Sequence, residues 1–422
     1  MPSKSFLALN LLPLFDNEDV TFNFPCKIPA GEKLNMLSVR RGERLIAFKD
    51  ELLRDPESRG PYQWLLISLY VISAAAVLAD GKFEQDPSFK LRTSYTGLSG
   101  LDQYLTFLAV IFMPGLRGWN PSFRMFQVYF LGLIAQPICI WTVESFRKRN
   151  ALTLLSVPAL WFILFQSTGI GFFMPLYYAA YTNISDTEPY WWPLRRAVKP
   201  LMGYLTAVPI QYAKVLLSAS LIGYFLPTVL MFIPWSDSEA AQIWRTFWQP
   251  SPVYVPLLTM VFGALYRWYR PLSAKEKRSP CAKDEPADLA LLNQLYIVIG
   301  VLGVLVHWYV LLSLVNHDTL SFTRVSLPNY SMSPMPLDQA FLGIFSVGFR
   351  GFFSASYVWC VCTTWDLRRV GRAEVDLAKA SLVILVAHLA LGPGAAMSAV
   401  WYWREDKMAV CFFPAARKEH KE

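Results

Sequence analysis

Four carboxyl side chains lie at the ends of apolar segments, where an acidic group can contact an apolar substrate. Glu144 closes the apolar run 138–143, and Asp102, Asp318 and Asp366 lie beside other such runs. Desolvation disfavours the charged form of a carboxyl and keeps it protonated near neutral pH. A protonated carboxylic acid in an apolar pocket can donate its proton to an alkene or to an epoxide oxygen. We expect Glu144 to be such a neutral acid, with Asp102 and Asp318 able to assist or to relay a proton.

Two of these carboxyls also have a structural interpretation. Glu144 precedes Arg147 and Lys148 by three and four residues, a spacing that allows an ion pair on a helix surface. Asp366 is followed by Arg368 and Arg369, which favours a charge network at the membrane surface.

A second group of polar residues interrupts the apolar segments themselves. Ionisable side chains at bilayer depth are costly and are often functional. A deep histidine can equally make a structural hydrogen bond, and a deep lysine or arginine can extend its charge to the interface. We expect the following residues to include substrate contacts: Gln166, Lys214, His307, Arg350 and, beside Asp318, His317; the deep His388 has the same two explanations.

Several catalytic patterns are absent from the sequence. No apolar segment holds two aspartates at D-x-x-x-D spacing, as magnesium-dependent prenyl transfer would need. The H-E-x-x-H, G-x-S-x-G and P-loop motifs do not occur, and four histidines are too few for a di-iron histidine box. The six cysteines show no zinc spacing. We therefore expect no metal site and no cofactor.

The elements that carry these residues are predicted to be membrane helices. Of the 422 residues 54% are hydrophobic and only 17% are charged, against about 25% charged in ordinary soluble domains. About 20 apolar residues span a bilayer as a helix. The sequence predicts an all-α transmembrane bundle of about nine spans (eight to ten) within 62–405, preceded by a cytosolic or interfacial segment 1–61 and followed by a tail 406–422. The apolar segments are 62–79, 104–116, 125–143, 152–181, 201–234, 253–269, 289–315, 340–365 and 375–403.

The fourth and ninth segments contain Gly169-Ile170-Gly171 and Gly392-Pro393-Gly394. Such interruptions are explained by packing kinks or, taken together, by a cavity.

Charge sets the expected orientation, because Lys and Arg gather in cytosolic loops. The formal net charge is +8, and its distribution between apolar segments favours anionic lipid over nucleic acid as the partner. With nine spans the basic connectors share one side, except Arg147-Lys148-Arg149, and Glu144 and Asp366 lie on opposite faces unless an early span is miscounted. Asn329-Tyr330-Ser331 is then a lumenal glycosylation acceptor, while Asn183-Ile184-Ser185 is cytosolic.

Three motifs give the chain a family resemblance. It resembles the fungal integral-membrane meroterpenoid cyclases, with the larger type from ascofuranone, ascochlorin and macrophorin pathways as the nearest in length. The motifs are Trp141-Thr142-Val143-Glu144-Ser145-Phe146-Arg147, Gln166-Ser167-Thr168-Gly169-Ile170-Gly171 with Pro175-Leu176-Tyr177, and Thr364-Trp365-Asp366-Leu367-Arg368-Arg369-Val370-Gly371.

This resemblance implies a proton-initiated cyclisation of a farnesylated polyketide, often one with a terminal epoxide. No diphosphate leaves in such a reaction, so no magnesium is required. It also implies a multi-pass protein of the endoplasmic reticulum membrane whose partners are a lipophilic prenylated substrate and the bilayer. Aromatic faces would guide the carbocation.

Two other classes of membrane protein remain open on the sequence alone. A membrane-bound acyltransferase would use a deep histidine such as His307 or His388, although its accompanying Arg, Trp and His motif is missing. A transporter-like protein would show a polar path through the bundle and internal symmetry, and no internal repeat is visible.

Overall fold

The computed structural model describes residues 92, 94–116, 118, 120–185, 206–235, 238–270, 288–316 and 337–409. Within these ranges all regular structure is helical and no strand occurs, which confirms the all-α prediction for this part of the chain. The expected first span 62–79, the residues His317 and Asp318, segment 1–61 and the end of the tail lie outside the described residues.

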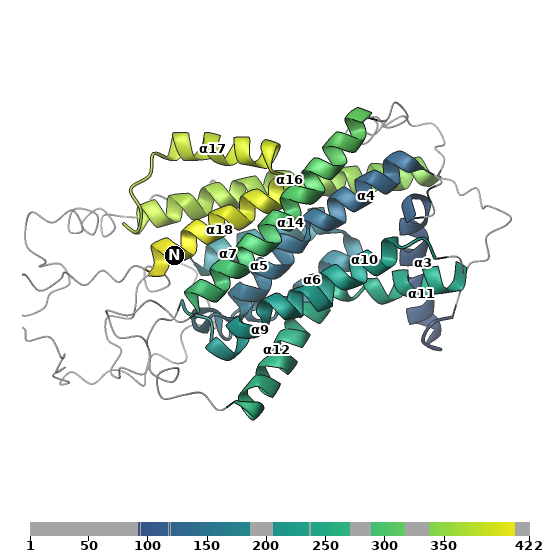
Figure 1. The fold of residues 1–422 in the computed structure, drawn as a ribbon, viewed down its shortest axis with the longest axis horizontal. Coiled ribbons are helices and arrows are strands. Elements are labelled where there is room, and N and C mark those ends of the chain that lie inside the picture. The colour runs from purple at the N-terminus through teal and green to yellow at the C-terminus, as the bar shows by residue number, and fades with distance from the viewer. Residues whose placement is uncertain are drawn as a thin grey trace, which may run out of the picture.

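Most helices run along one common direction, with α3 and α11 at one end of the bundle (Figure 1). Two short 3₁₀ turns, η2 (Lys148–Asn150) and η3 (Leu154–Ser156), follow α5, and a π-helical segment, η5 (Leu221–Phe225), joins α9 to α10. The helices are α3 (Ser99–Leu116), α4 (Pro121–Leu133), α5 (Ala135–Phe146), α6 (Pro158–Thr168), α7 (Ile170–Ile184), α9 (Ile210–Ser220), α10 (Leu226–Phe232), α11 (Ser238–Trp248), α12 (Ser251–Tyr269), α14 (Leu289–Asn316), α16 (Leu337–Arg369), α17 (Leu377–Ala390) and α18 (Pro393–Ala409).

Local sequence explains where several helices begin. Asn120 caps α4 by accepting a hydrogen bond from the Phe123 amide at 3.0 Å, and Pro121 occupies the first helical position, where its missing N–H costs nothing. Asp376 caps α17 in the same way through the Ala378 amide at 3.0 Å.

Four helical segments among the described residues are long and apolar enough to cross a membrane: Pro121–Phe146, Ile210–Phe232, Leu289–Asn316 and Phe341–Arg369. The helix α14 also exposes apolar side chains, including Val301, Leu305 and Leu312, on the face turned away from the bundle. A helix that is apolar all round needs either protein or lipid on every side. These helices are consistent with a membrane protein, while the count of about nine spans stays a prediction.

The predicted fourth span, 152–181, is not one continuous helix. α6 and α7 meet at Gly169, whose φ of 101° is a conformation that favours glycine. The two helices pack against each other, and the rings of Trp161 and Tyr177, equally far from Gly169 in sequence, lie 5.4 Å apart. The segment is therefore a helical hairpin whose two open ends lie at the same end of the bundle.

The predicted ninth span, 375–403, forms a second hairpin. α17 and α18 meet at Gly392, which has a φ of 88°, and they pack together. Arg372, which precedes α17, donates a hydrogen bond to the Met408 carbonyl near the end of α18 at 3.0 Å. This hairpin also begins and ends at one end of the bundle.

That shared end is called the arginine end below; α5, α7, α16 and α18 finish there, and α9 and α14 begin there. Contacts across it join Arg147 to the Thr206 carbonyl at 2.5 Å and the Val208 amide to Asp288 at 2.7 Å. Met408 contacts both Arg149 and Arg372. Glu144 and Asp366 thus lie at the same end, so the expectation of opposite faces is wrong.

The physical reason for this difference lies in α3 and in the first hairpin. α3 lies across the opposite end of the bundle rather than along it (Figure 1), and it packs on α4 and α11 there. The predicted second span, 104–116, therefore does not cross the bundle, which moves Glu144 to the other side. The predicted fourth span, 152–181, turns back on itself and does not cross either. These two changes cancel, so the segments after the first hairpin keep the sides predicted for them.

A ladder of stacked aromatic rings fills the core near the arginine end. Trp141 stacks on Tyr177 with ring centroids 3.8 Å apart, Tyr178 stacks on Trp359 at 4.0 Å, and Trp359 lies 4.0 Å from Trp401. These rings come from α5, α7, α16 and α18. The two stacked pairs hold the first hairpin against α5 and α16, and the tilted contact between Trp359 and Trp401 joins the second hairpin to α16.

Candidate active site

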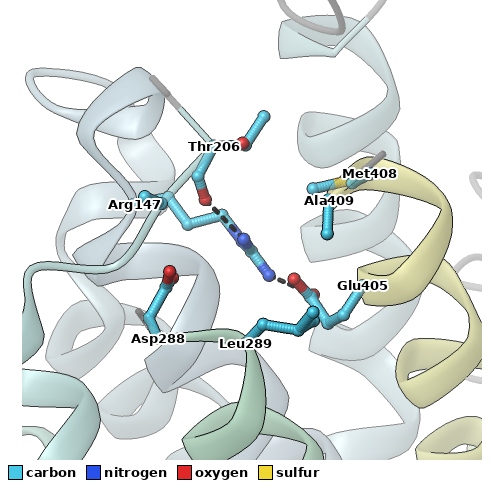
Figure 2. Close-up of a pocket in the computed structure, with 8 residues that line it drawn as sticks. Arg147, Thr206, Asp288, Leu289, Glu405, Met408 and Ala409 are labelled. Carbon is cyan, nitrogen blue, oxygen red and sulfur yellow. Dashed lines mark hydrogen bonds and ion pairs between the residues drawn. The ribbon is translucent and has the colours of Figure 1, made fainter. Parts of the chain in front are cut away.

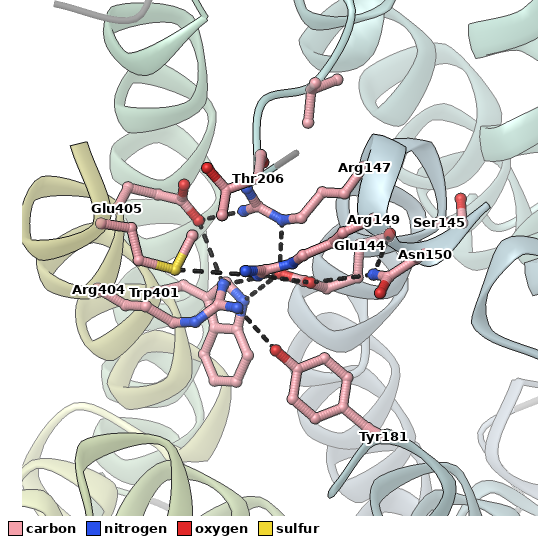
Figure 3. Close-up of polar contacts among 12 residues, drawn as sticks. Glu144, Ser145, Arg147, Arg149, Asn150, Tyr181, Thr206, Trp401, Arg404 and Glu405 are labelled. Carbon is pink, nitrogen blue, oxygen red and sulfur yellow. Dashed lines mark hydrogen bonds and ion pairs between the residues drawn. The ribbon is translucent and has the colours of Figure 1, made fainter. Parts of the chain in front are cut away.

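Glu144 is completely buried at the arginine end, where it accepts several hydrogen bonds (Figure 3). Its Oε1 atom accepts hydrogen bonds from Arg404 Nη1 at 2.7 Å, Arg147 Nε at 3.0 Å and Trp401 Nε1 at 3.2 Å. A third guanidinium, that of Arg149, lies 3.9 Å from Oε2. The helix α5 positions the carboxyl, Arg147 directly follows this helix, η2 supplies Arg149, and α18 supplies Arg404.

This environment contradicts the expectation that Glu144 is a neutral acid in an apolar pocket. Three guanidinium groups within ion-pairing distance favour the carboxylate, and a carboxylate cannot donate a proton. The expected ion pair with Arg147, three residues on, is present, but it is buried and does not lie on a helix surface.

Glu405 extends this arrangement by one further carboxylate. It pairs with Arg147 Nη2 and lies 3.4 Å from Arg404 Nη1. Arg404 also donates to the Tyr181 hydroxyl at 2.7 Å. Glu144, Arg147, Arg149, Arg404 and Glu405 are called the arginine–glutamate cluster below. Charges in such a desolvated network depend on one another, because removing one leaves its partner buried and unpaired.

A small pocket opens beside the cluster (Figure 2). Arg147 and Glu405 form one part of its wall, Asp288 lies across from them, and Glu144 is not among the lining residues. The remaining wall is mostly apolar. The lining residues are Arg147, Thr206, Ala207, Asp288, Leu289, Glu405, Met408 and Ala409.

Asp288 is a buried carboxyl that the sequence interpretation missed. It is 5% exposed, and its Oδ2 atom accepts the Val208 amide at 2.7 Å. Burial raises the pKa of Asp288, although the Val208 N–H and the Arg147 charge oppose that shift. The signal was present in the sequence, because Asp288 directly precedes the apolar segment 289–315 as Asp102 precedes 104–116.

Asp102 lies far from this site, at the opposite end of the bundle. It is 5% exposed and accepts Thr96 N at 2.7 Å, Thr96 Oγ1 at 2.8 Å and Gly97 N at 3.1 Å. These bonds close the turn that precedes α3. The expectation that Asp102 shares a side with Glu144 is wrong, because α3 does not run along the bundle.

Asp366 is buried at the arginine end, in contact with neighbours on its own helix. Arg369 Nη2 lies 3.4 Å from its Oδ1 atom, and the Arg369 guanidinium lies 5.4 Å from the centre of the Trp365 ring. Of the surface charge network expected beside Asp366, the pair with Arg369 is present, and Asp366 itself is buried. Asp318 and His317 lie outside the described residues.

The deep histidines have partners within the bundle. His307 Nδ1 lies 2.9 Å from the Tyr129 hydroxyl, and its Nε2 lies 3.2 Å from the Leu389 carbonyl. His388 Nδ1 lies 2.8 Å from the Ile384 carbonyl. The His307 contacts join α14 to α4 and α17, and the His388 contact lies within α17, as the structural explanation of a deep histidine predicts.

The other predicted substrate contacts are likewise held by protein groups, away from the pocket lining. Whether the predicted residues, the histidines included, contact a substrate stays a prediction. The bonds join Gln166 Nε2 to Gln249 Oε1 at 2.6 Å, Lys214 Nζ to the Tyr266 hydroxyl at 2.6 Å, and Arg350 Nε to the Ser346 carbonyl at 3.3 Å.

Comparison with known proteins places this geometry in a family context. The CtvD domain family matches residues 72–334, which include Glu144 and Asp288. Terpene cyclase resF of Aspergillus sclerotiorum is 26% identical over 364 residues, which is 82% of this chain and 95% of resF. Terpene cyclase ctvD of Aspergillus terreus is 30% identical over 184 residues, which is 42% of this chain and 49% of ctvD.

A second kind of relative is longer. The FAD-dependent monooxygenase verC1 of Penicillium polonicum is 27% identical over 287 residues, which is 67% of this chain but 32% of verC1. The chain thus matches about a third of the length of the monooxygenases to which it is similar. No solved structure is significantly similar to the chain.

Proposed function

Because the chain belongs to the CtvD domain family, we propose that it is a membrane-bound terpene cyclase that cyclises a farnesylated polyketide after protonating it. The observation that carries the proposal is the pocket at the arginine end. Two buried carboxyls, Asp288 and Glu405, line it beside the apolar side chains of Leu289, Met408 and Ala409. An acid next to apolar side chains is the combination that proton transfer to a prenyl chain requires.

The proposed reaction begins when an acid protonates the terminal epoxide of the prenyl chain. The bond between the epoxide oxygen and the tertiary carbon breaks, which leaves a cation on that carbon. The neighbouring alkene then attacks this cation. Loss of a proton from the last cation ends the reaction, so the product is an isomer of the substrate. No diphosphate departs, so the reaction itself calls for no magnesium.

The names of the longer relatives fit an epoxide as the reactive group. They are named FAD-dependent monooxygenases, and flavin-dependent oxygenation is one route from an alkene to an epoxide. A substrate of this chain that carries a terminal epoxide would then come from an oxygenation of that class.

The lipid bilayer would bring the substrate to the enzyme, because a farnesyl chain partitions into hydrocarbon. We place the protein in the endoplasmic reticulum membrane as a multi-pass protein with the arginine end toward the cytosol. Basic residues concentrate on the cytosolic side of membrane proteins. At the arginine end they include Arg147, Lys148, Arg149, Arg368, Arg369, Arg372, Arg404 and Lys407.

Yeast microsomes that contain the protein should convert a farnesylated polyketide epoxide into a cyclic isomer of unchanged mass, detected by liquid chromatography and mass spectrometry. Microsomes from cells with the empty vector should not. A parallel incubation with acyl-CoA distinguishes the acyltransferase alternative. An acylated product, or the absence of any isomer, would contradict the proposed function.

A further inference from the structure

On the premise of the proposed function, we propose that Asp288 is the catalytic acid and that the pocket it lines takes the epoxide-bearing end of the prenyl chain. Asp288 lies at the start of α14, where it also joins the segment before α9. It belongs to none of the three motifs that carry the family resemblance.

The buried carboxyls described at the arginine end differ in their partners. Glu144, Glu405 and Asp366 each have an arginine within ion-pairing distance. Asp288 differs, since the donor recorded for it in the described part of the chain is the uncharged Val208 amide. A buried carboxyl without a direct guanidinium partner is the one that most readily holds a proton.

Asp288 also lies where it can meet a bound substrate, in the wall of the pocket. Its carboxyl forms part of the polar wall, and Leu289 and Met408 flank the same space. An epoxide has a polar oxygen on carbons that bear methyl groups, so it suits a wall that is polar in one place and apolar beside it. The space is about 20 Å³ in this structure, room for one water molecule, so the epoxide enters only when the side chains around it move apart. Glu144 does not line this space, and Arg147 lies between Glu144 and the pocket.

The pocket also supplies a positive charge for the negative charge that develops on the acid. When Asp288 gives its proton to the epoxide oxygen, the carboxyl becomes a carboxylate, and the electron pair of the broken carbon–oxygen bond stays on the new hydroxyl. Arg147 lines the same pocket, fixed by Glu405 and by the Thr206 carbonyl at 2.5 Å. A fixed positive charge stabilises a carboxylate that forms during the reaction. The proton lost from the last carbocation returns to the carboxylate directly or through solvent, which restores the acid.

Asp288→Asn is the direct test, because its amide oxygen can still accept the Val208 N–H. We expect kcat to fall by roughly 100-fold or more, since general acid catalysis contributes about that factor, with KM changed little. Asp288→Glu, which restores a carboxyl, should recover part of the rate. The matched control is Asp376→Asn, at an exposed cap that asparagine fills as well as aspartate; it should leave kcat unchanged.

Two measurements decide the assignment: the pH dependence of the wild-type kcat and the kcat of folded Asp288→Asn. The wild-type kcat should be highest at low pH and fall as pH rises through the pKa of Asp288, because the reaction needs the protonated form. A flat profile from about pH 5 to pH 9 would overturn the assignment, even if Asp288→Asn failed to fold. So would a folded Asp288→Asn enzyme with near-normal kcat. In both of those cases wild-type turnover leaves the proposed function intact, whereas a wild-type protein with no cyclase activity would defeat the proposed function itself.

Discussion

Glu144→Gln should cost the protein its stability, not only its activity. The substitution removes the negative charge that Arg147 and Arg404 contact at 3.0 and 2.7 Å, while all of these side chains stay buried. Breaking a buried pair by removing one partner typically costs about 3–5 kcal/mol. That is a large fraction of the roughly 5–15 kcal/mol that holds an ordinary domain folded. We expect a marked loss of monodisperse protein in detergent and a lower thermal midpoint.

A double substitution separates this explanation from a general intolerance of the site. Glu144→Gln with Arg404→Gln removes an anion and a cation together, so it should be more stable than either single variant. Glu239→Gln is the matched control, because it breaks the pair with Arg92 at 3.6 Å, in which Glu239 is 71% exposed; exposed pairs contribute about 1 kcal/mol or less. A Glu144→Gln protein with an unchanged thermal midpoint but no turnover would instead restore Glu144 as the acid.

Glycosylation mapping should show the orientation of the bundle in the membrane, because an acceptor asparagine is modified only on the lumenal side. Asn329-Tyr330-Ser331 lies in sequence between α14, which runs away from the arginine end, and α16, which returns to it. With the arginine end in the cytosol, Asn329 faces the lumen and should carry a glycan. Asn183-Ile184-Ser185 lies where α7 finishes at the arginine end, so it should stay unmodified.

The measurement is a gel shift after endoglycosidase H treatment of microsomes. The shift should disappear in Asn329→Gln and persist in Asn183→Gln. The opposite pattern would show that the arginine end faces the lumen. That would contradict the proposed orientation but not the internal arrangement of the site.

The composition of the chain was sufficient to predict an all-α bundle with helices apolar enough to span a membrane, and some segments were predicted closely. The apolar segment 289–315 became α14 (Leu289–Asn316) almost residue for residue. The hairpins at Gly169 and Gly392 were not predicted, although both glycines were noted. A glycine in an apolar segment fits a kink as well as a reversal, and the packing of each helix pair decides between them.

The candidate site was harder to predict, because its charges come from distant parts of the sequence. Glu144 met the local criterion for a desolvated acid, yet its partner Arg404 lies 260 residues further on. Asp288 met the same criterion and has no ion-paired arginine among the residues that the structure describes. Local sequence places a carboxyl at the end of an apolar helix, but only the tertiary contacts decide whether an arginine reaches it.

The central claim, that a buried acid initiates cyclisation by proton transfer, is tested most directly by chelation. Purified protein in lipid nanodiscs should be incubated with the farnesylated epoxide, with and without excess EDTA. Our account predicts the same rate of formation of the cyclic isomer in both reactions. A rate abolished by EDTA and restored by added magnesium would contradict it.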